Sequence, residues 1–381
     1  MFLYLLHMNF KTEKGPTYSF IVEWYDPYAT IVRTYVLGYH SGDNSVEMYD
    51  QKTHKLFLKS TKVDDLKLSD FYLGSSITLL SRTLRIVDFG DNFTEKVFVG
   101  KSERCVAFIR PDAVCEAGHI ISTLEGKGFR LVNLKMICLT SEEIPQLFED
   151  PVDYTKLPNL LTELSEKLTI AMELMCENAC ARIRQVVGLT TGDTESAFVA
   201  DSTMMVFAKS VESAACQADK IFGHPGGPRF RGSPRLVGTT LAVIKPHAVA
   251  EGLTGHIWTV IQDGGFCVTA ARLYRLSKVD AAEFLEVYKG VVHEYPEMLD
   301  QFSSGPCLAL EIASSKESNG STLKAFRDFV GPSDPEIARF LRPETLRAKF
   351  GVNKVRNAVH CTDLPDDGEL EVNFFFRILD K

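Results

Sequence analysis

A histidine near the C-terminus stands among residues suited to moving a phosphoryl group. His360 lies within residues 356–363 (RNAVHCTD), with an amide shortly before it and a hydroxyl shortly after it. An imidazole nitrogen can attack phosphorus if cations hold the phosphoryl oxygens. The same third of the chain supplies such cations as Lys245, Arg327 and Arg347. One histidine or arginine alone is usually a core or surface residue, but this combination indicates phosphoryl transfer through a histidine.

A carboxylate downstream of this histidine could orient the ring. Glu371 follows His360 by eleven residues and is our candidate to accept a hydrogen bond from the ring nitrogen that does not attack phosphorus. Such a bond would select one tautomer of the imidazole. The hydroxyl groups of Thr362 and Ser333 are candidates to support this arrangement.

The elements that must position these residues occur twice in the chain. Residues 106–114 (VAFIRPDAV) resemble residues 241–249 (LAVIKPHAV), and the triplet GHI at 118–120 recurs at 255–257. The offset between the copies drifts slowly along the chain, which indicates one duplicated domain with small insertions in its loops. The period is far too long for a solenoid repeat.

The second copy alternates between strand and helix patterns. An apolar strand ends at Pro246, and a helix with one apolar face follows it. Ser277 and Asp280 fit a capping box at the start of another helix, between two further apolar strands. This alternation favours a ferredoxin-like α/β sandwich. We expect strands at 266–276 and 307–313 and a helix at 323–330 that ends at Gly331 as its C-cap. Another short helix is expected to begin at Pro343.

Residues before about Lys101 have a different pattern, with short β-branched and aromatic runs separated by Gly, Asp, Asn and Pro. Such runs predict a small all-β module. A Gly/Pro-rich stretch separates the two copies. We therefore divide the chain into a small all-β domain (13–101), a first α/β copy (102–217), a linker (218–237) and a second copy (238–381).

Composition excludes several classes of protein. The formal net charge of -8 argues against nonspecific nucleic-acid binding, which needs many Lys and Arg side chains. No apolar run is long enough to span a bilayer, and the apolar start Met1–Leu6 lacks the features of a signal peptide. The nine cysteines include no C-x-x-C pair, so we expect reduced thiols and no zinc site.

Residues 239–376 resemble nucleoside diphosphate kinases. The resemblance is carried jointly by IKP at 244–246, SGP at 304–306, GPSDP at 331–335, PETLR at 343–347 and NAVH at 357–360. In that family the matched histidine is transiently phosphorylated, and a γ-phosphate moves from a nucleoside triphosphate to a nucleoside diphosphate by a ping-pong route.

The resemblance also implies roles for single residues. Lys245, Arg327 and Arg347 would hold phosphates, and Asn357 would meet the sugar or the terminal phosphate. Ser333 keeps the hydroxyl of the family's threonine, and Glu371 would orient the catalytic His360. No metal site of the protein itself is implied, since Mg²⁺ would enter with ATP or another nucleoside triphosphate, held mainly by phosphate oxygens.

Some positions depart from the family pattern. His247 stands where the family has an aspartate, and Cys361 stands where it has a glycine. The segment that clamps the base is about two residues shorter, which leaves open whether Tyr288 or Tyr295 stacks on the base. An insertion near residues 336–342 alters a loop that the family uses for subunit contacts.

The first copy, residues 102–217, resembles the same family more weakly. Arg110 replaces the lysine, and no Pro-x-Thr-x-Arg segment is present. The best match places Val206 where the nucleophile should be and Gln217 where the orienting carboxylate should be, while Arg184 and Thr190 are retained. Valine cannot carry a phosphoryl group, so we expect this copy to serve packing or docking.

The N-terminal module resembles the small, PH-like β domain shared by axonemal proteins of cilia, through residues 23–27 (EWYDP), 45–48 (SVEM) and 84–91 (LRIVDFGD). By resemblance, a β domain of this kind followed by two kinase-like domains implies a protein of ciliary doublet microtubules, a microtubule inner protein. Its partners would be tubulin and other axonemal proteins, besides nucleotides. The expected location is the cilium axoneme, the cytoplasm and the cytoskeleton, without membrane or nucleic-acid partners. The alternative is a soluble, active nucleoside diphosphate kinase in nucleotide homeostasis.

Overall fold

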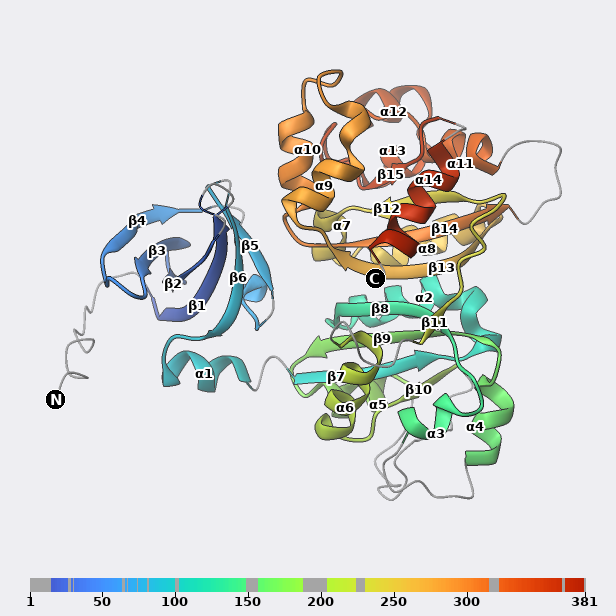
Figure 1. The fold of residues 1–381 in the computed structure, drawn as a ribbon, viewed down its shortest axis with the longest axis horizontal. Coiled ribbons are helices and arrows are strands. Elements are labelled where there is room, and N and C mark those ends of the chain that lie inside the picture. Colours follow the sequence, from blue (N-terminus) through green and yellow to red (C-terminus); the bar gives the residue numbers. More distant parts are fainter. Residues whose placement is uncertain are drawn as a thin grey trace. The chain divides into compact units, whose positions relative to one another are not determined.

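The computed structural model describes most of the chain, namely residues 15–26, 29, 31–63, 66, 68–73, 75–80, 82–99, 103–148, 157–187, 204–223, 230–314, 322–364 and 367–379. The chain divides into two compact units, Met1–Gly100 and Lys101–Lys381, each with its own core (Figure 1). Within these ranges no helix has the length and apolar character needed to cross a membrane.

In the first unit the described strands form one antiparallel sheet in the order β4-β3-β2-β1-β6-β5. Alternate side chains point into its core, as Phe20 and Val22 do on β1, which is the pattern of half-buried strands. A short helix, α1, follows β6, and its Phe98 packs edge-on against Phe20. The elements are β1 (Thr17–Asp26), β2 (Ile31–His40), β3 (Ser45–Asp50), β4 (Leu56–Lys62), β5 (Ser76–Leu79), β6 (Arg82–Phe89) and α1 (Asn92–Val99).

The predicted N-terminal sheet is therefore present, whereas the likeness to a PH domain stays an expectation. Helix α1 was not predicted. Asp91 accepts a hydrogen bond from the Thr94 amide at the start of this helix, and Thr94 in turn accepts one from the Ser19 amide. These contacts join the helix start to β1, a long-range interaction that no local pattern reveals.

The second unit is built on a single antiparallel sheet whose main path is β10-β7-β9-β8-β13-β14-β12-β15, with β11 paired to β8. Read outward from its middle, the sheet repeats one order, β8-β9-β7-β10 on one side and β13-β14-β12-β15 on the other. Each half thus has the strand order of a ferredoxin-like fold, with helices between the strands, and the mixed α/β class is confirmed.

The elements of the first half are β7 (Glu103–Ile109), α2 (Ala117–Gly126), β8 (Arg130–Cys138), α3 (Glu143–Leu147), α4 (Leu157–Leu164), β9 (Leu168–Cys176), α5 (Ala179–Val186), β10 (Met205–Phe207) and α6 (Val211–Phe222), followed by β11 (Arg231–Gly232). Those of the second half are β12 (Thr240–Ile244), α7 (Pro246–Ala250), α8 (Thr254–Asp263), β13 (Phe266–Arg275), α9 (Lys278–Phe284), α10 (Tyr295–Phe302), β14 (Pro306–Ser314), α11 (Thr322–Val330), α12 (Pro335–Leu341), α13 (Leu346–Phe350), β15 (Val359–Cys361) and α14 (Gly368–Asn373).

The two halves meet where β8 pairs with β13, through Lys135 and Arg272, and where α2 lies against α8 (Figure 1). Two glycines allow the helices to approach. A Cβ on Gly118 would lie 2.4 Å from the Thr259 amide nitrogen, and one on Gly255 would lie 2.0 Å from that of Ser122. Because any larger side chain would separate the helices, the repeated glycine of the GHI triplet has a packing role at both positions.

The helices also cap each other across this junction. The Gln262 side chain accepts a hydrogen bond from the Gly118 amide at 3.1 Å and donates one to the Val114 carbonyl at 3.1 Å. Conversely, the Glu125 carboxylate accepts a hydrogen bond from the Gly255 amide at 2.8 Å. Burial raises the pKa of Glu125. Amides at the starts of both helices are thus satisfied by the opposite copy.

Two segments differ from the sequence-based expectation. The insertion near residues 336–342 forms a helix, α12, which begins at Pro335 behind Asp334, and the Asp334 side chain accepts a hydrogen bond from the Glu336 amide. Helix α6 continues to Phe222 and so extends into the segment taken as the linker. Its apolar end packs on the core of the first copy.

Candidate active site

His360 is the central residue of β15, opposite Val243 of β12. The imidazole is buried, and the rings of Phe284 and Phe302 meet it edge-on with centroids 4.9 and 6.2 Å away. Ala358, two residues earlier, has a left-handed backbone with φ of 66°, which is unfavourable for alanine. Strain of this kind persists where the surrounding structure enforces it, and functional sites are common examples.

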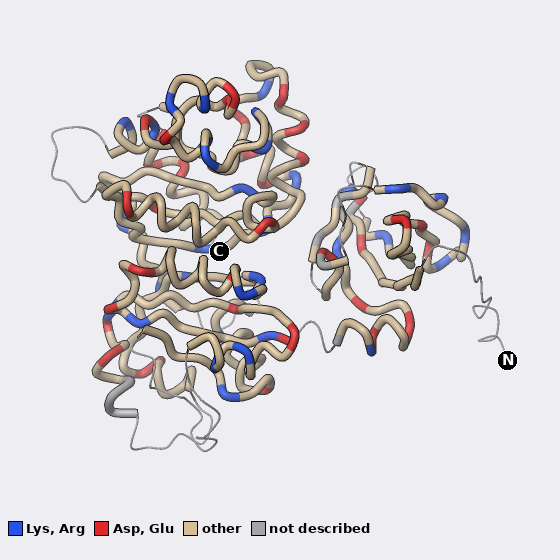
Figure 2. Tube along the Cα trace, turned by 180° about the vertical axis from the view of Figure 1, so that it is seen from behind, with Lys and Arg blue, Asp and Glu red and all other residues tan. Residues whose placement is uncertain are grey.

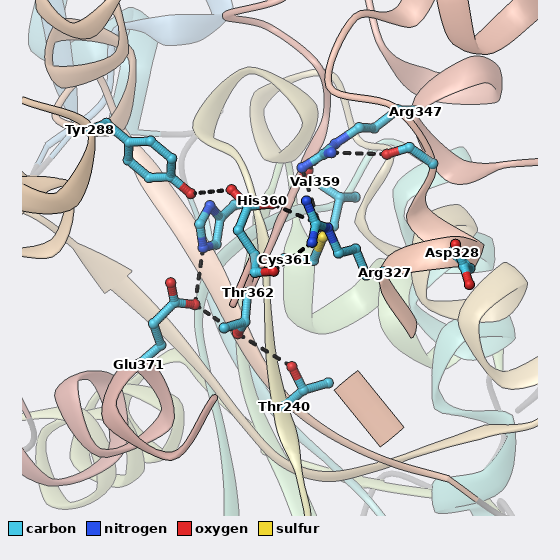
Figure 3. A network of polar contacts seen from close by, with 12 residues as sticks. Thr240, Tyr288, Arg327, Asp328, Arg347, Val359, His360, Cys361, Thr362 and Glu371 are labelled. Atoms are coloured by element: carbon cyan, nitrogen blue, oxygen red, sulfur yellow. Dashed lines mark hydrogen bonds and ion pairs between the residues drawn. The ribbon is translucent and has the colours of Figure 1, made fainter. Parts of the chain in front are cut away.

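A chain of hydrogen bonds holds the imidazole from one side (Figure 3). The His360 Nε2 atom lies 3.1 Å from the Glu371 carboxylate of α14. The same carboxylate oxygen accepts a hydrogen bond from the Thr362 hydroxyl at 2.8 Å, and Thr362 accepts one from Thr240 at 3.3 Å. This contact makes Nε2 the protonated nitrogen. Because Nδ1 has no hydrogen-bond partner among the described residues, it is the nitrogen left to attack an electrophile.

Lys245 follows β12 directly and is the N-cap residue of α7. Its buried ammonium donates a hydrogen bond to the Val355 carbonyl at 2.9 Å and lies 5.3 Å from the centre of the Phe302 ring. Burial, followed by repulsion from Arg347, lowers the pKa of Lys245 to about 7. Among the described residues no carboxylate pairs with this lysine. An arriving anion would supply the missing negative charge.

Arg347 lies on α13 and is also buried. Its guanidinium donates hydrogen bonds to the carbonyls of Val359 and Gly331, each at 3.0 Å, and one amino group lies 3.9 Å from the Cys361 sulfur. None of the described carboxylates forms an ion pair with it. The two carbonyl contacts fix the guanidinium against the strand that carries the histidine.

Arg327 and Tyr288 both contact Asp363, a residue to which the sequence patterns gave no role. The Tyr288 hydroxyl donates to the Asp363 side chain at 2.7 Å, and Arg327 of α11 donates to the Asp363 carbonyl at 2.6 Å. The Arg327 Nε atom lies 3.5 Å from the Asp363 carboxylate. Burial, and then the bond to Asp363, raise the pKa of Tyr288, so its hydroxyl stays protonated.

Asn357 connects this region to the turn after α11. Its amide nitrogen donates to the Ser333 carbonyl at 2.9 Å, while its side-chain oxygen is buried and has no hydrogen-bond partner among the described residues. A ligand hydroxyl could donate to that oxygen. The Ser333 side chain is exposed on the same turn. Thus all seven predicted site residues come from the second copy, and contacts through β15 and its flanking turns link them.

His247 is a further buried polar residue beside the site. Its Nδ1 atom lies 3.0 Å from the Gln301 amide nitrogen, and its Nε2 atom is buried with no hydrogen-bond partner in the described part of the chain. Burial, and then the charges of Arg356 and Lys245, lower the pKa of His247 to about 3, so the ring is neutral. A neutral ring cannot compensate the charge of Lys245 as a carboxylate would.

Comparisons with known proteins agree with this geometry. A family model for nucleoside diphosphate kinase matches residues 103–217 and 238–380. The chain is 39% identical over 375 residues to nucleoside diphosphate kinase homolog 7 of Rattus norvegicus, which covers 96% of this chain and 94% of that protein. The homolog 7 of Mus musculus shows the same identity and coverage. The chain belongs to the nucleoside diphosphate kinase family. A nucleoside diphosphate kinase of Aquifex aeolicus is 32% identical over 141 residues, 37% of this chain and 95% of that protein.

The first family match contains a different residue at the nucleophile position. Val206 lies on β10 opposite Phe108 of β7, just as His360 lies opposite Val243 in the second copy. Gln217 lies on α6, eleven residues after Val206, just as Glu371 of α14 lies eleven residues after His360, and the Gln217 side chain is buried. The first copy therefore has an apolar side chain where the second copy has its imidazole.

The cations of the first copy also have other partners. Arg110, the counterpart of Lys245, forms an ion pair of 2.7 Å with Glu163 of α4. Arg184 of α5 donates a hydrogen bond to the Lys209 carbonyl. Thr190 lies outside the described residues. With one cation paired and the nucleophile replaced, the described part of this copy lacks the anion-binding arrangement of the second.

In the part of the chain that the structure describes, the residues offer no cage for a metal ion of their own. Among the described residues, no group of three or more His, Cys, Asp or Glu side chains is arranged to hold one.

Two tyrosines were candidates to stack on the nucleotide base. The Tyr288 hydroxyl is hydrogen-bonded to Asp363, near the histidine, whereas Tyr295 begins α10 and packs on the core. These placements favour neither tyrosine as the base-stacking residue.

Proposed function

We propose that residues 238–381 form a nucleoside diphosphate kinase that passes a γ-phosphate through a phosphohistidine at His360. The observation that carries this proposal is the state of the imidazole, with Nε2 bonded to the Glu371 carboxylate and Nδ1 without a partner among the described residues. A histidine prepared in this way is a nucleophile whose second nitrogen stabilises the positive charge that develops during attack.

The chemistry proceeds in two balanced steps. In the first, the Nδ1 lone pair attacks the γ-phosphorus, and the bond to the bridging oxygen breaks, so that a nucleoside diphosphate leaves with the electron pair. In the second, a terminal oxygen of another nucleoside diphosphate attacks the same phosphorus, and the bond to Nδ1 breaks. The Glu371 carboxylate accepts the hydrogen bond from Nε2 throughout and favours the charged ring.

Positive charge at the site suits a triphosphate. Lys245 and Arg347 are buried, and both donate hydrogen bonds to backbone carbonyls. Neither charge is compensated by a described carboxylate. Phosphate oxygens can replace those carbonyls or add to them, and charge-assisted bonds of this kind are stronger than neutral ones. Mg²⁺ belongs to the substrate in this proposal, carried in on ATP or another nucleoside triphosphate.

Labelling with γ-³²P-ATP tests this function. The purified chain should form a phosphoenzyme that is stable in base and labile in acid, with the label on His360. His360→Ala should remove the label, and His293→Ala, which alters an exposed histidine of the same copy, should retain it. If His360→Ala is labelled as strongly as the native chain, the proposed nucleophile is wrong.

We further propose that the chain is a component of ciliary doublet microtubules, a microtubule inner protein with tubulin and other axonemal proteins as partners. The N-terminal β unit supports this through its resemblance to a domain of axonemal proteins. A first copy that keeps a packed core but has valine in place of the nucleophile also supports an architectural role. The alternative is a soluble enzyme that acts in nucleotide homeostasis.

Fractionation of cilia separates these two roles. A structural component should stay with isolated axonemes after the membrane and soluble matrix are removed, and deletion of residues 1–100 should prevent its incorporation. Release with the soluble matrix, or normal incorporation of the deletion variant, would favour the soluble enzyme. The labelling result is independent of this outcome.

A further inference from the structure

One end of the N-terminal β unit holds an arginine between two aromatic rings. Arg82 is the first residue of β6, and its guanidinium lies 5.1 Å from the centre of the Trp24 ring on β1 and 5.4 Å from that of Phe57 on β4. The Phe57 ring also packs on Tyr35 of β2, with centroids 4.4 Å apart. Side chains from four strands thus meet at one place.

This arginine has an unmet hydrogen-bonding requirement. Its Nε–H is buried and has no hydrogen-bond partner among the described residues, a costly state for a charged donor. The guanidinium carbon lies over both rings, and its N–H groups point outward along the edge of the plane, where a ligand would form hydrogen bonds. A carboxylate matches the edge of a guanidinium with two parallel hydrogen bonds.

The strand beside it is unusually basic for this acidic chain. Residues 51–63 contain Lys52, Lys55, Lys59 and Lys62 and no acidic residue, although the whole chain has a net charge of -8. All four lysines are exposed. Two of them, Lys59 and Lys62, lie on β4, and Figure 2 shows where the basic and acidic residues of this unit lie along the chain. Leu56 and Phe57 on the same strand are 48% and 42% exposed, so the strand presents apolar surface as well as charge.

Strand β4 is also an edge of the sheet. Among the described residues it pairs with β3 alone, and that pairing contains register shifts. Lysines and irregular pairing on an edge strand commonly prevent aggregation, so these features alone would indicate protection. The buried Arg82 donor is not explained by protection, because Arg82 lies on β6 and not on the edge strand.

We propose that this surface, formed by Trp24, Phe57, Arg82 and the lysines Lys55, Lys59 and Lys62, binds an acidic peptide segment in an extended conformation. One carboxylate of the peptide contacts Arg82, and further carboxylates lie along the lysines. At about 3.3 Å per residue, Lys55 and Lys62 are roughly 23 Å apart on an extended strand. This spacing suits carboxylates distributed along a chain better than the compact headgroup of a single lipid.

Peptide titration of the full chain tests the proposal. The probe is a fluorescently labelled peptide of alternating glutamate and threonine, with a glutamine-threonine peptide as the uncharged control. The glutamate peptide should bind with an affinity that falls as salt is raised, and the control should not bind. The peptide should also protect Trp24 from iodide quenching, because the other tryptophan, Trp258, is fully buried.

Matched variants identify the residue responsible. Arg82→Gln should weaken binding about tenfold to a hundredfold, the effect expected for a charged hydrogen-bond pair. Arg85→Gln, on an exposed position of the same strand, should change it less than twofold. Arg82→Lys should give an intermediate value, since it keeps the charge but not the planar fork. Thermal denaturation checks that each variant is folded.

If Arg82→Gln does not fold, the combined change of Lys55, Lys59 and Lys62 to glutamine gives the answer, because these side chains are exposed. It should lower the affinity at least tenfold and flatten the salt dependence. Three results would overturn the proposal: equal binding of the glutamine peptide, no effect of these variants, or binding of phosphoinositide vesicles without binding of the peptide.

Discussion

Replacing Lys245 by methionine should stabilise the free protein while removing most of its phosphotransfer. Burial, and then Arg347, lower the pKa of this lysine from 10.5 to about 7. The folded state therefore binds this proton less tightly than the unfolded chain does. Protonated Lys245 opposes folding at neutral pH, and the stability of the native protein should rise between pH 7 and pH 10.5 as the unfolded chain loses the same proton.

The size of the effect follows from this difference. At about 1.4 kcal/mol per pKa unit, the charge of Lys245 costs folding about 4 kcal/mol at pH 7 and about 2 kcal/mol at pH 9. Methionine removes this cost, but it also removes the hydrogen bond to Val355 and the contact with the Phe302 ring, together about 2 kcal/mol. Lys245→Met should thus be more stable by about 2 kcal/mol at pH 7 and about equal to the native chain at pH 9.

Urea unfolding at the two pH values, followed by the fluorescence of buried Trp258, measures both differences. Other titrating groups contribute equally to the two proteins and cancel. Exposed Lys289→Met is the control and should show no such pH dependence. Phosphoenzyme formation by Lys245→Met should fall about 10²–10³-fold, as for other preorganised charges. A variant less stable than the native chain at pH 7, or a difference that does not change with pH, would refute this reasoning.

Three further changes test other parts of the account. Glu371→Gln should slow phosphoenzyme formation about tenfold in rapid-quench assays, less than loss of a cation, because the amide still accepts a hydrogen bond but carries no charge. Gly255→Val should lower the calorimetric unfolding temperature by many degrees, because its Cβ would lie 2.0 Å from the Ser122 nitrogen; an unchanged temperature would contradict the tight helix contact. Val206→His should give no second labelled peptide in mass-spectrometric mapping, because Arg110, the counterpart of Lys245, is ion-paired with Glu163 and Gln217 replaces the orienting carboxylate; label on that copy would mean that its site is functional.

The catalytic candidates could be predicted because their geometry is local. His360 and Glu371 are eleven residues apart, and a short strand followed by a helix is enough to bring them to 3.1 Å. Lys245 directly follows a strand whose residues are all buried. Gly331, with a positive φ of 86°, ends a helix. The periodicity of the strands, the glycine at the end of one helix and the spacing between His360 and Glu371 were therefore enough to predict much of the second copy.

The contacts that tertiary packing creates could not be predicted in this way. Asp363 binds Tyr288, which is far from it in sequence, and the Phe284 ring that meets the histidine comes from another helix. No local pattern marks either partner. The repeat indicated two similar domains, but the joining of β8 to β13 and the reciprocal capping by Gln262 and Glu125 depend on both copies together.

Transfer from an isolated phosphoenzyme is the most direct test of the central claim. The chain is labelled with γ-³²P-ATP, freed of nucleotide, and then mixed with an unlabelled nucleoside diphosphate. The account predicts that the label is on His360 and leaves as nucleoside triphosphate. A label that stays on the protein, or one that maps to a residue other than His360, would contradict it.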